Sequence, residues 1–194
     1  MKLNIYIKER NIKTLGPYNR FGIWVQGCNR SCDGCVARMS HDPRSGTQID
    51  TGALAWEIIL SDTEGITVSG GEPFLQAAAL TELITKVKRR RDIGVIIYTG
   101  YLLEELSDVD GAADLLSFTD LLIDGPYIRE LDDGLSLRGS SNQRVLPLTE
   151  RYKDHLDEYG TTSRQTEVFV HHDNVNIVGI PNMRSEQKGE AKER

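Results

Sequence analysis

Four short apolar runs that end beside glycines constrain the fold of this chain more than any other feature. They read FGIWVQG, GITVSGG, IGVIIYTG and DLLIDG, and their glycines fall at Gly27, Gly70, Gly100 and Gly125. Runs that are apolar almost throughout, with helical segments between them, are typical of parallel strands in a sheet covered on at least one face. Ligands of such sheets bind at the carboxyl ends of the strands, so we expect the four glycine turns to face one common site.

The segments between these runs carry apolar side chains at helical spacing. One covers residues 51–61 and opens with Thr51 as a candidate N-cap, and another covers residues 75–91 and ends in the basic run KVKRRR. Because cations suit a helix C-terminus, we interpret this run as an exposed helix end rather than a binding patch. Both tryptophans, Trp24 and Trp56, are predicted in the core.

The C-terminal part of the chain has a different character. The sequence EVFVHHDNVNIVGIP predicts two strands around a His-Asp-Asn turn, with His171 and His172 as solvated turn residues. The last residues have almost nothing to bury. We therefore predict a main domain over residues 1–148, an extension with a β-hairpin over residues 149–182, and a disordered tail over residues 183–194.

The overall composition excludes several classes of function. The chain has 194 residues, a formal net charge of -6 and a pI near 5.3, so it lacks the basic surface that nucleic-acid binders usually carry. No apolar run is long enough for a signal peptide or a membrane span. We expect a cytoplasmic protein with neither a nucleic-acid nor a membrane partner. In that reducing compartment, clustered cysteines favour metal or redox chemistry over disulfides.

All three cysteines lie within CNRSCDGC, residues 28–35, in the spacing C-x3-C-x2-C. Three thiols are one short of a closed four-ligand metal site. A structural zinc ion would need a fourth ligand such as His41, and inert buried cysteines would not suit so polar a loop. An iron–sulfur cluster held by three thiolates would leave one iron open to a ligand from outside the protein, which is what a catalytic metal requires.

The cysteine spacing and the downstream sequence SGGEP together resemble the radical S-adenosylmethionine (radical SAM) superfamily. The resemblance implies that Cys28, Cys32 and Cys35 hold a 4Fe-4S cluster, whose open iron is chelated by S-adenosylmethionine. It also implies reductive cleavage of this cofactor to methionine and a 5'-deoxyadenosyl radical. The glycines of the SGGEP turn would allow close approach to the cofactor's amino group. The residues implied in cofactor binding are Gly34, Ser69, Gly70, Gly71, Glu72, Tyr98, Thr99, Gly100 and Asp124.

Longer blocks narrow the resemblance. The segments LGPYNRFGIWVQGC, GITVSGGEP, IIYTGYLLEEL and FTDLLIDGPYIRELDDGLSLRGSSNQR, within residues 15–145, are similar to activating proteins of anaerobic ribonucleoside-triphosphate reductase. That family implies an α/β fold of the partial (β/α) barrel type, open on one side, and hydrogen abstraction from a glycine of the partner reductase. Arg138, Ser140 and Asn142 would meet the cofactor or the partner chain. An external reductant, flavodoxin or ferredoxin, is implied because no flavin or nicotinamide fingerprint is present.

Departures from the family pattern keep alternatives open. Val36 and Ala37 stand where the family carries an aromatic residue and an asparagine, Tyr18 replaces a glycine, and Glu72 replaces the common aspartate. The residues after position 145 also extend beyond the last shared block, where they could dock a different protein or cover the open site. The alternatives are a radical SAM enzyme that modifies another protein, peptide or small molecule, and a non-catalytic iron–sulfur or zinc module.

Overall fold

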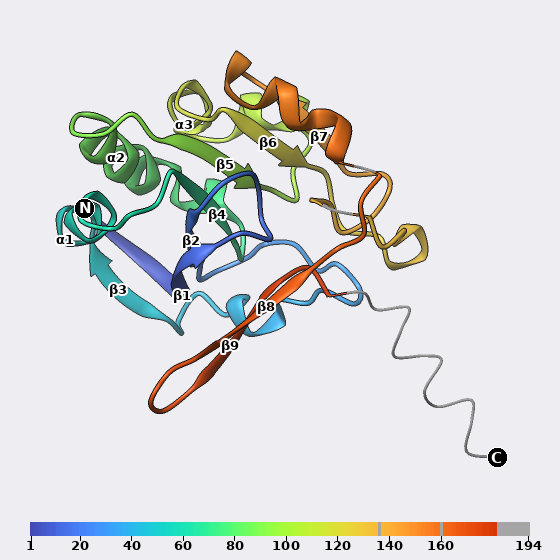
Figure 1. The fold of residues 1–194 in the computed structure, drawn as a ribbon, viewed down its shortest axis with the longest axis horizontal. Coiled ribbons are helices and arrows are strands. Elements are labelled where there is room, and N and C mark those ends of the chain that lie inside the picture. Colours follow the sequence, from blue (N-terminus) through green and yellow to red (C-terminus); the bar gives the residue numbers. More distant parts are fainter. Residues whose placement is uncertain (136, 160, 182–194) are drawn as a thin grey trace.

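A seven-stranded sheet forms the centre of the computed structural model, which describes residues 1–135, 137–159 and 161–181 (Figure 1). The strands lie in the order β3-β1-β2-β4-β5-β6-β7. Their bounds are β1 Lys2–Ile12, β2 Arg20–Val25, β3 Thr47–Asp50, β4 Gly65–Gly70, β5 Gly94–Tyr98, β6 Leu121–Asp124 and β7 Arg144–Pro147. The predicted tail, residues 183–194, lies outside the described residues.

The four apolar runs of the sequence are β2, β4, β5 and β6, and they pair in parallel as predicted. The strands β1, β3 and β7 pair antiparallel with their neighbours at the two sides of this parallel core. Of these, β3 and β7 are short and were not predicted. The architecture is therefore a mixed α/β sheet with a parallel centre and a C-terminal β-hairpin.

One side of the sheet, the helix face, packs against α1 Thr51–Ile59, α2 Ala77–Lys88 and α3 Ala112–Ser117 (Figure 1). Its core joins sheet residues such as Val68 and Val95 to helix residues such as Leu80 and Leu83, all fully buried. No helix among the described residues is long and apolar enough to cross a membrane. The 3-10 helices are η1 Arg38–Ser40, η2 Pro73–Gln76, η3 Leu103–Asp108, η4 Arg129–Leu131 and η5 Glu150–Glu158.

Two predictions about α1 are corrected by the structure. Asp50 is the N-cap, because its Oδ1 accepts hydrogen bonds from the backbone N–H groups of Gly52 (2.9 Å) and Ala53 (3.0 Å). Thr51 instead donates to the carbonyl of Met1. Trp56 is 55% exposed rather than part of the core, because it lies on the side of α1 away from the sheet.

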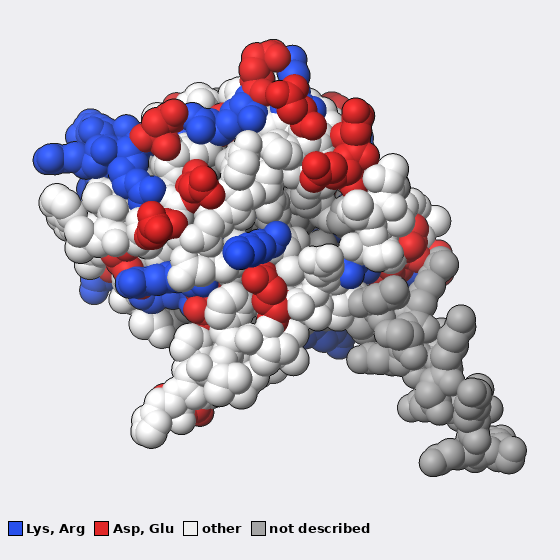
Figure 2. Space-filling model, in the orientation of Figure 1, with Lys and Arg blue, Asp and Glu red and all other residues white. Residues whose placement is uncertain are grey.

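The basic end of α2 is partly paired within the chain and partly exposed, whereas an exposed helix end was predicted. Lys86 pairs with Glu82 (2.7 Å) and Lys88 with Asp120 (3.6 Å). Arg91 donates to the carbonyl of Ile58 at the end of α1 and to carbonyls of the connection between α1 and β4. Arg89 and Arg90 of the same run are exposed, and cations gather over this corner of the molecule (Figure 2).

The opposite side of the sheet, the extension face, is covered by the C-terminal part of the chain. Tyr152 of η5 packs against Ile96 and Leu121. The hairpin β8 Thr166–Val170 and β9 Val175–Gly179 packs its inner side chains against the end of β1 and against Leu15. Alternate residues of the same strands therefore serve two different cores, as the two-residue period of a strand dictates.

The hairpin is tied to the main domain by two carboxylates. Glu167 accepts hydrogen bonds from the backbone N–H groups of Lys13 (2.8 Å) and Thr14 (3.0 Å). Glu9, which is 7% exposed, accepts from Asn176 (3.0 Å) and lies 2.7 Å from His171 Nε2. His171 is therefore anchored to β1 rather than a purely solvated turn residue.

Candidate active site

A cleft opens at the carboxyl ends of the parallel strands, with a volume of about 870 Å³ that includes solvent at its mouth. The predicted glycine turns meet there: Gly70, Gly100 and Gly125 line the cleft, and Gly27 directly precedes a lining cysteine. Among the described residues, the cleft is lined by Cys28, Arg30, Cys32, Cys35, Val36, Ala37, His41, Ser69, Gly70, Gly71, Glu72, Tyr98, Thr99, Gly100, Gly125, Tyr127, Asp132, Gly139, Gln143, Ile180 and Pro181.

The cysteine loop follows β2 and is held by the segment after it. Gly27 N–H donates to the carbonyl of Ser40 (2.7 Å), and Cys28 N–H donates to that of His41 (3.1 Å). All three cysteines are free thiols, partly buried. Burial raises the pKa of the Cys28 and Cys35 thiols, so these two carry protons at neutral pH that metal binding must displace.

The thiols suit an iron–sulfur cluster better than a zinc ion. His41 Nε2 lies 3.3 Å from Cys35 Sγ, yet no three metal-ligating side chains in the described part of the chain converge on one ion position. A closed site of three cysteines and one histidine is therefore not formed. The thiolates of a 4Fe-4S cluster bind different irons, so they need only line one cavity. Cys28, Cys32 and Cys35 do so.

The Gly-Gly-Glu turn after β4 lies against the strand that leads into the cysteine loop. A Cβ on Gly71 would stand 2.1 Å from the carbonyl oxygen of Gly27, and one on Gly70 would stand 2.5 Å from Val25 N. The backbone φ of Gly70 is also +104°, which side chains disfavour. Glu72 N–H donates to the Gly27 carbonyl (2.8 Å). The two glycines therefore fix the position of the turn relative to the cysteine loop.

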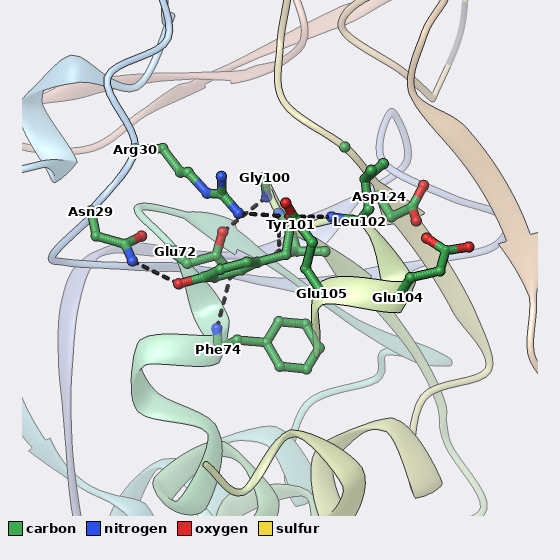
Figure 3. A network of polar contacts seen from close by, with 12 residues as sticks. Asn29, Arg30, Glu72, Phe74, Gly100, Tyr101, Leu102, Glu104, Glu105 and Asp124 are labelled. Atoms are coloured by element: carbon green, nitrogen blue, oxygen red, sulfur yellow. Dashed lines mark hydrogen bonds and ion pairs between the residues drawn. The ribbon is translucent and has the colours of Figure 1, made fainter. Parts of the chain in front are cut away.

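Glu72 is 1% exposed and joins the ends of β4 and β5 (Figure 3). Its carboxylate accepts hydrogen bonds from Phe74 N–H (3.1 Å), Thr99 Oγ1 (2.8 Å) and Gly100 N–H (2.8 Å). Burial outweighs these bonds and raises the pKa of the carboxyl. Because a carboxylate has about four acceptor positions, Glu72 keeps a remaining acceptor for a donor in the cleft.

The cysteine loop is also fastened to the turn after β5. The Arg30 guanidinium lies 4.0 Å from the centre of the Tyr101 ring and pairs with Glu105 (3.0 Å), while Asn29 donates to the Tyr101 hydroxyl (2.6 Å) (Figure 3). A cation over an aromatic face is favourable. Sequence reasoning missed Arg30, although its position inside the cysteine motif was a signal that the loop carries more than ligands.

Several predicted site residues bond within the chain. Asp124 is fully buried and accepts from Leu103 N–H (2.8 Å) and from Arg144. Arg138 pairs with Asp133 (2.6 Å). Ser140 accepts from Ile128 N–H, Asn142 donates to the carbonyl of Pro126, and Gly34 has a φ of +70° beside Arg129. The described lining of the cleft does not include these five predicted residues.

The other predicted cofactor-binding residues do reach the cleft. Its lining includes Ser69, Gly70, Gly71, Glu72, Tyr98, Thr99 and Gly100. It also includes four residues of the connection between β6 and β7, which are Tyr127, Asp132, Gly139 and Gln143. The extension contributes Ile180 and Pro181, which follow β9, to the described lining. The sequence around Ile180 and Pro181 did not indicate that they line the cleft, because Gly-Ile-Pro after a strand is typical of any loop.

The fold and the cleft define an iron–sulfur protein of mixed α/β architecture, and residues 14–146 match the family model described as a 4Fe-4S single cluster domain. The anaerobic ribonucleoside-triphosphate reductase-activating protein of Vibrio cholerae is 38% identical over 140 residues, covering 67% of this chain and 88% of the relative. The protein of the same name from Escherichia coli K12 is 34% identical over 141 residues, covering 67% of this chain and 89% of the relative. The one from enterobacteria phage T4 is 30% identical over 141 residues, covering 70% of this chain and 88% of the relative. The chain belongs to the family of anaerobic ribonucleoside-triphosphate reductase-activating proteins.

Proposed function

We propose that this protein is a radical SAM enzyme that activates an anaerobic ribonucleotide reductase by generating a glycyl radical on it. One observation supports this most directly: the three thiols of C-x3-C-x2-C and the Gly-Gly-Glu turn line one cleft, in a chain whose relatives are named as activating proteins of that reductase.

The cluster ligands in this proposal are Cys28, Cys32 and Cys35. A 4Fe-4S cluster held by these three thiolates would supply the electron for reductive cleavage of S-adenosylmethionine. The chain supplies placement: the raised thiol pKa values mean that Cys28 and Cys35 release protons when they ligate iron. Gly34 gives the loop between the second and third ligands its left-handed turn.

The cofactor would be held by the turns after β4 and β5. Ser69, Gly70 and Gly71 bring backbone acceptors to the cleft, and the free acceptor position of Glu72 suits the cationic amino group. Tyr98, Thr99 and Gly100 line the neighbouring wall and are proposed to meet the adenosyl group. These residues orient the cofactor and exclude water from it.

Four further residues are proposed to shape the wall of the cleft where cofactor and partner meet: Asp124, Arg138, Ser140 and Asn142. Their hydrogen bonds and ion pairs hold the connection between β6 and β7. Removal of any one would therefore change binding through the wall rather than through a lost ligand.

The finer description of the fold is also part of the proposal. A partial (β/α) barrel, open on one side, is supported by four parallel strands whose carboxyl ends form the cleft. The proposed division is a radical SAM domain over residues 1–148 and an extension over residues 149–182, which agrees with a family match that ends at residue 146. The proposed reductant is flavodoxin or ferredoxin, in the cytoplasm.

Anaerobic reconstitution with iron and sulfide tests this function. The expected protein binds about four irons, cleaves S-adenosylmethionine when reduced, and produces a glycyl doublet in the electron paramagnetic resonance spectrum when mixed with the reductase. Cys32→Ala should abolish cluster binding. Cleavage without a doublet would favour modification of another protein, peptide or small molecule, and a cluster without cleavage would leave a non-catalytic module.

A further inference from the structure

Arg164 is the most heavily bonded buried cation of the extension. Its side chain is 2% exposed, and it lies between η5 and β8, beyond the residues that match the family model. The guanidinium pairs with Asp132 (3.0 Å) and donates to the carbonyls of Gly139 (2.6 Å) and Pro181 (3.1 Å). It also donates to the carbonyls of Leu135 and Arg138, both at 3.0 Å.

These bonds connect two separate segments of the cleft wall. Asp132 and Gly139 belong to the connection between β6 and β7, whereas Pro181 follows the hairpin, and all three line the cleft. Asp132 also accepts hydrogen bonds from Gly134 N–H (3.0 Å) and from the hydroxyl of Tyr127 (3.1 Å), another lining residue. One guanidinium thus sets the distance between the two segments.

Only a planar fork of several donors can make this set of bonds. Arginine offers five N–H donors in fixed directions, whereas lysine offers a compact ammonium on a flexible stem. The hairpin does not depend on Arg164 for attachment, since Glu167 and Glu9 tie it to β1 and the turn that follows. The bonds of Arg164 therefore serve the wall of the cleft more than the hairpin.

We propose that Arg164 is a positioning residue that makes the C-terminal extension part of the cofactor-binding cleft, by fixing the wall formed by Asp132, Gly139 and Pro181. The inference rests on the proposed function for the identity of the ligand, S-adenosylmethionine. The cysteine loop receives no bond from Arg164 among the described contacts, so loss of this residue acts on cofactor binding and spares cluster assembly.

The test compares Arg164→Ala and Arg164→Lys with Arg151→Ala. Arg151 is the matched control, because it is an arginine of the same extension whose ion pairs with Asp92 and Asp120 lie away from the cleft lining. After anaerobic reconstitution, iron content, equilibrium binding of S-adenosylmethionine and steady-state cleavage are measured for each protein. Backbone hydrogen exchange is followed in the cluster-free proteins.

Arg164→Ala should weaken S-adenosylmethionine binding about tenfold or more, since small displacements of positioning groups have large effects. Its KM should rise more than its kcat falls, its iron content should match wild type, and exchange should accelerate in residues 132–135 and 137–139. Arg164→Lys should weaken binding less than Arg164→Ala. Added guanidinium ion should partly restore binding to Arg164→Ala and leave Arg151→Ala unchanged.

Wild-type affinity in Arg164→Ala, with or without faster exchange of the wall, would overturn the inference. Should Arg164→Ala fail to fold, Arg164→Lys decides, and wild-type affinity in that variant would refute the positioning role. Failure of the proposed function looks different: the wild-type protein would then bind a cluster without cleaving S-adenosylmethionine. Binding that still depends on Arg164 in that protein would support the inference alone.

Discussion

The helix face and the extension face of the central sheet are held by different forces. The helix face buries a continuous cluster of aliphatic side chains from α1, α2 and α3. The extension face has smaller apolar clusters and places buried polar groups among them, including Arg20, Tyr152 and Arg164. The first arrangement depends on apolar area, which is nondirectional; the second depends on particular hydrogen bonds, and the cleft opens on that side.

Arg20 illustrates the second arrangement. It is fully buried on β2 and donates to Thr67 Oγ1 (2.5 Å), to the Tyr152 hydroxyl (2.8 Å) and to the carbonyl of Ile66 (2.7 Å). A buried charge is costly unless it is well bonded. The extension contributes one of these bonds, so the extension face gains specificity from partners that must all be present together.

The largest effect is expected on the helix face. Leu83→Ala removes a fully buried side chain from α2, and the cavity that remains should lower the free energy of unfolding by about 2–5 kcal/mol. Urea unfolding followed by circular dichroism measures this loss. A loss below about 1 kcal/mol would show that the helix face adapts to the cavity, and would weaken its contrast with the extension face.

On the extension face, Tyr152→Phe should lower the free energy of unfolding by about 1–3 kcal/mol, because buried Arg20 loses an acceptor. Tyr159→Phe is the matched control: within the described residues its buried hydroxyl has no hydrogen-bond partner, so removal of the hydroxyl should cost close to nothing. Equal losses in the two variants would mean that packing of the rings, rather than the bond to Arg20, governs this face.

A smaller, pH-dependent effect is expected where the hairpin meets β1. Burial favours a higher pKa for Glu9, but the hydrogen bonds from Asn176 and His171 outweigh it and hold the pKa below the usual 4.5. An acid with a lowered native pKa stabilises the fold above its unfolded pKa, and this contribution disappears as the pH falls through the native value. Glu9→Gln should therefore cost about 1 kcal/mol at pH 7.

The difference between wild type and Glu9→Gln should shrink as the pH falls below 4.5, the ordinary pKa of the group. Chemical denaturation at a series of pH values measures it. A difference that stays constant down to the lowest pH at which the protein folds would show that the ionised carboxylate is not what holds the hairpin.

The contrast also explains what the sequence could predict. Leu80 and Leu83 lie on one face of a helical repeat, and the glycine runs mark strand ends, so the helix face and the convergence of the turns follow from local pattern. Arg164 could not be found this way, because its carbonyl partners lie 25 to 29 residues earlier and 17 residues later, and depend on tertiary packing. Asp124 had the position of a ligand, yet Arg144, 20 residues later, takes its carboxylate.

The smallest effect is expected on the outer side of the hairpin. Val170 and Ile177 are 77% and 68% exposed, so Val170→Thr and Ile177→Thr should change the free energy of unfolding by less than about 0.5 kcal/mol. Val178→Thr provides the contrast: the residue is 1% exposed, and a buried unpaired hydroxyl should cost about 1–3 kcal/mol. Similar losses on both sides would show that the outer side is covered in solution. If Val178→Thr costs more than the two outer substitutions, one side of the hairpin belongs to the extension face and the other contributes almost nothing to the free energy of unfolding.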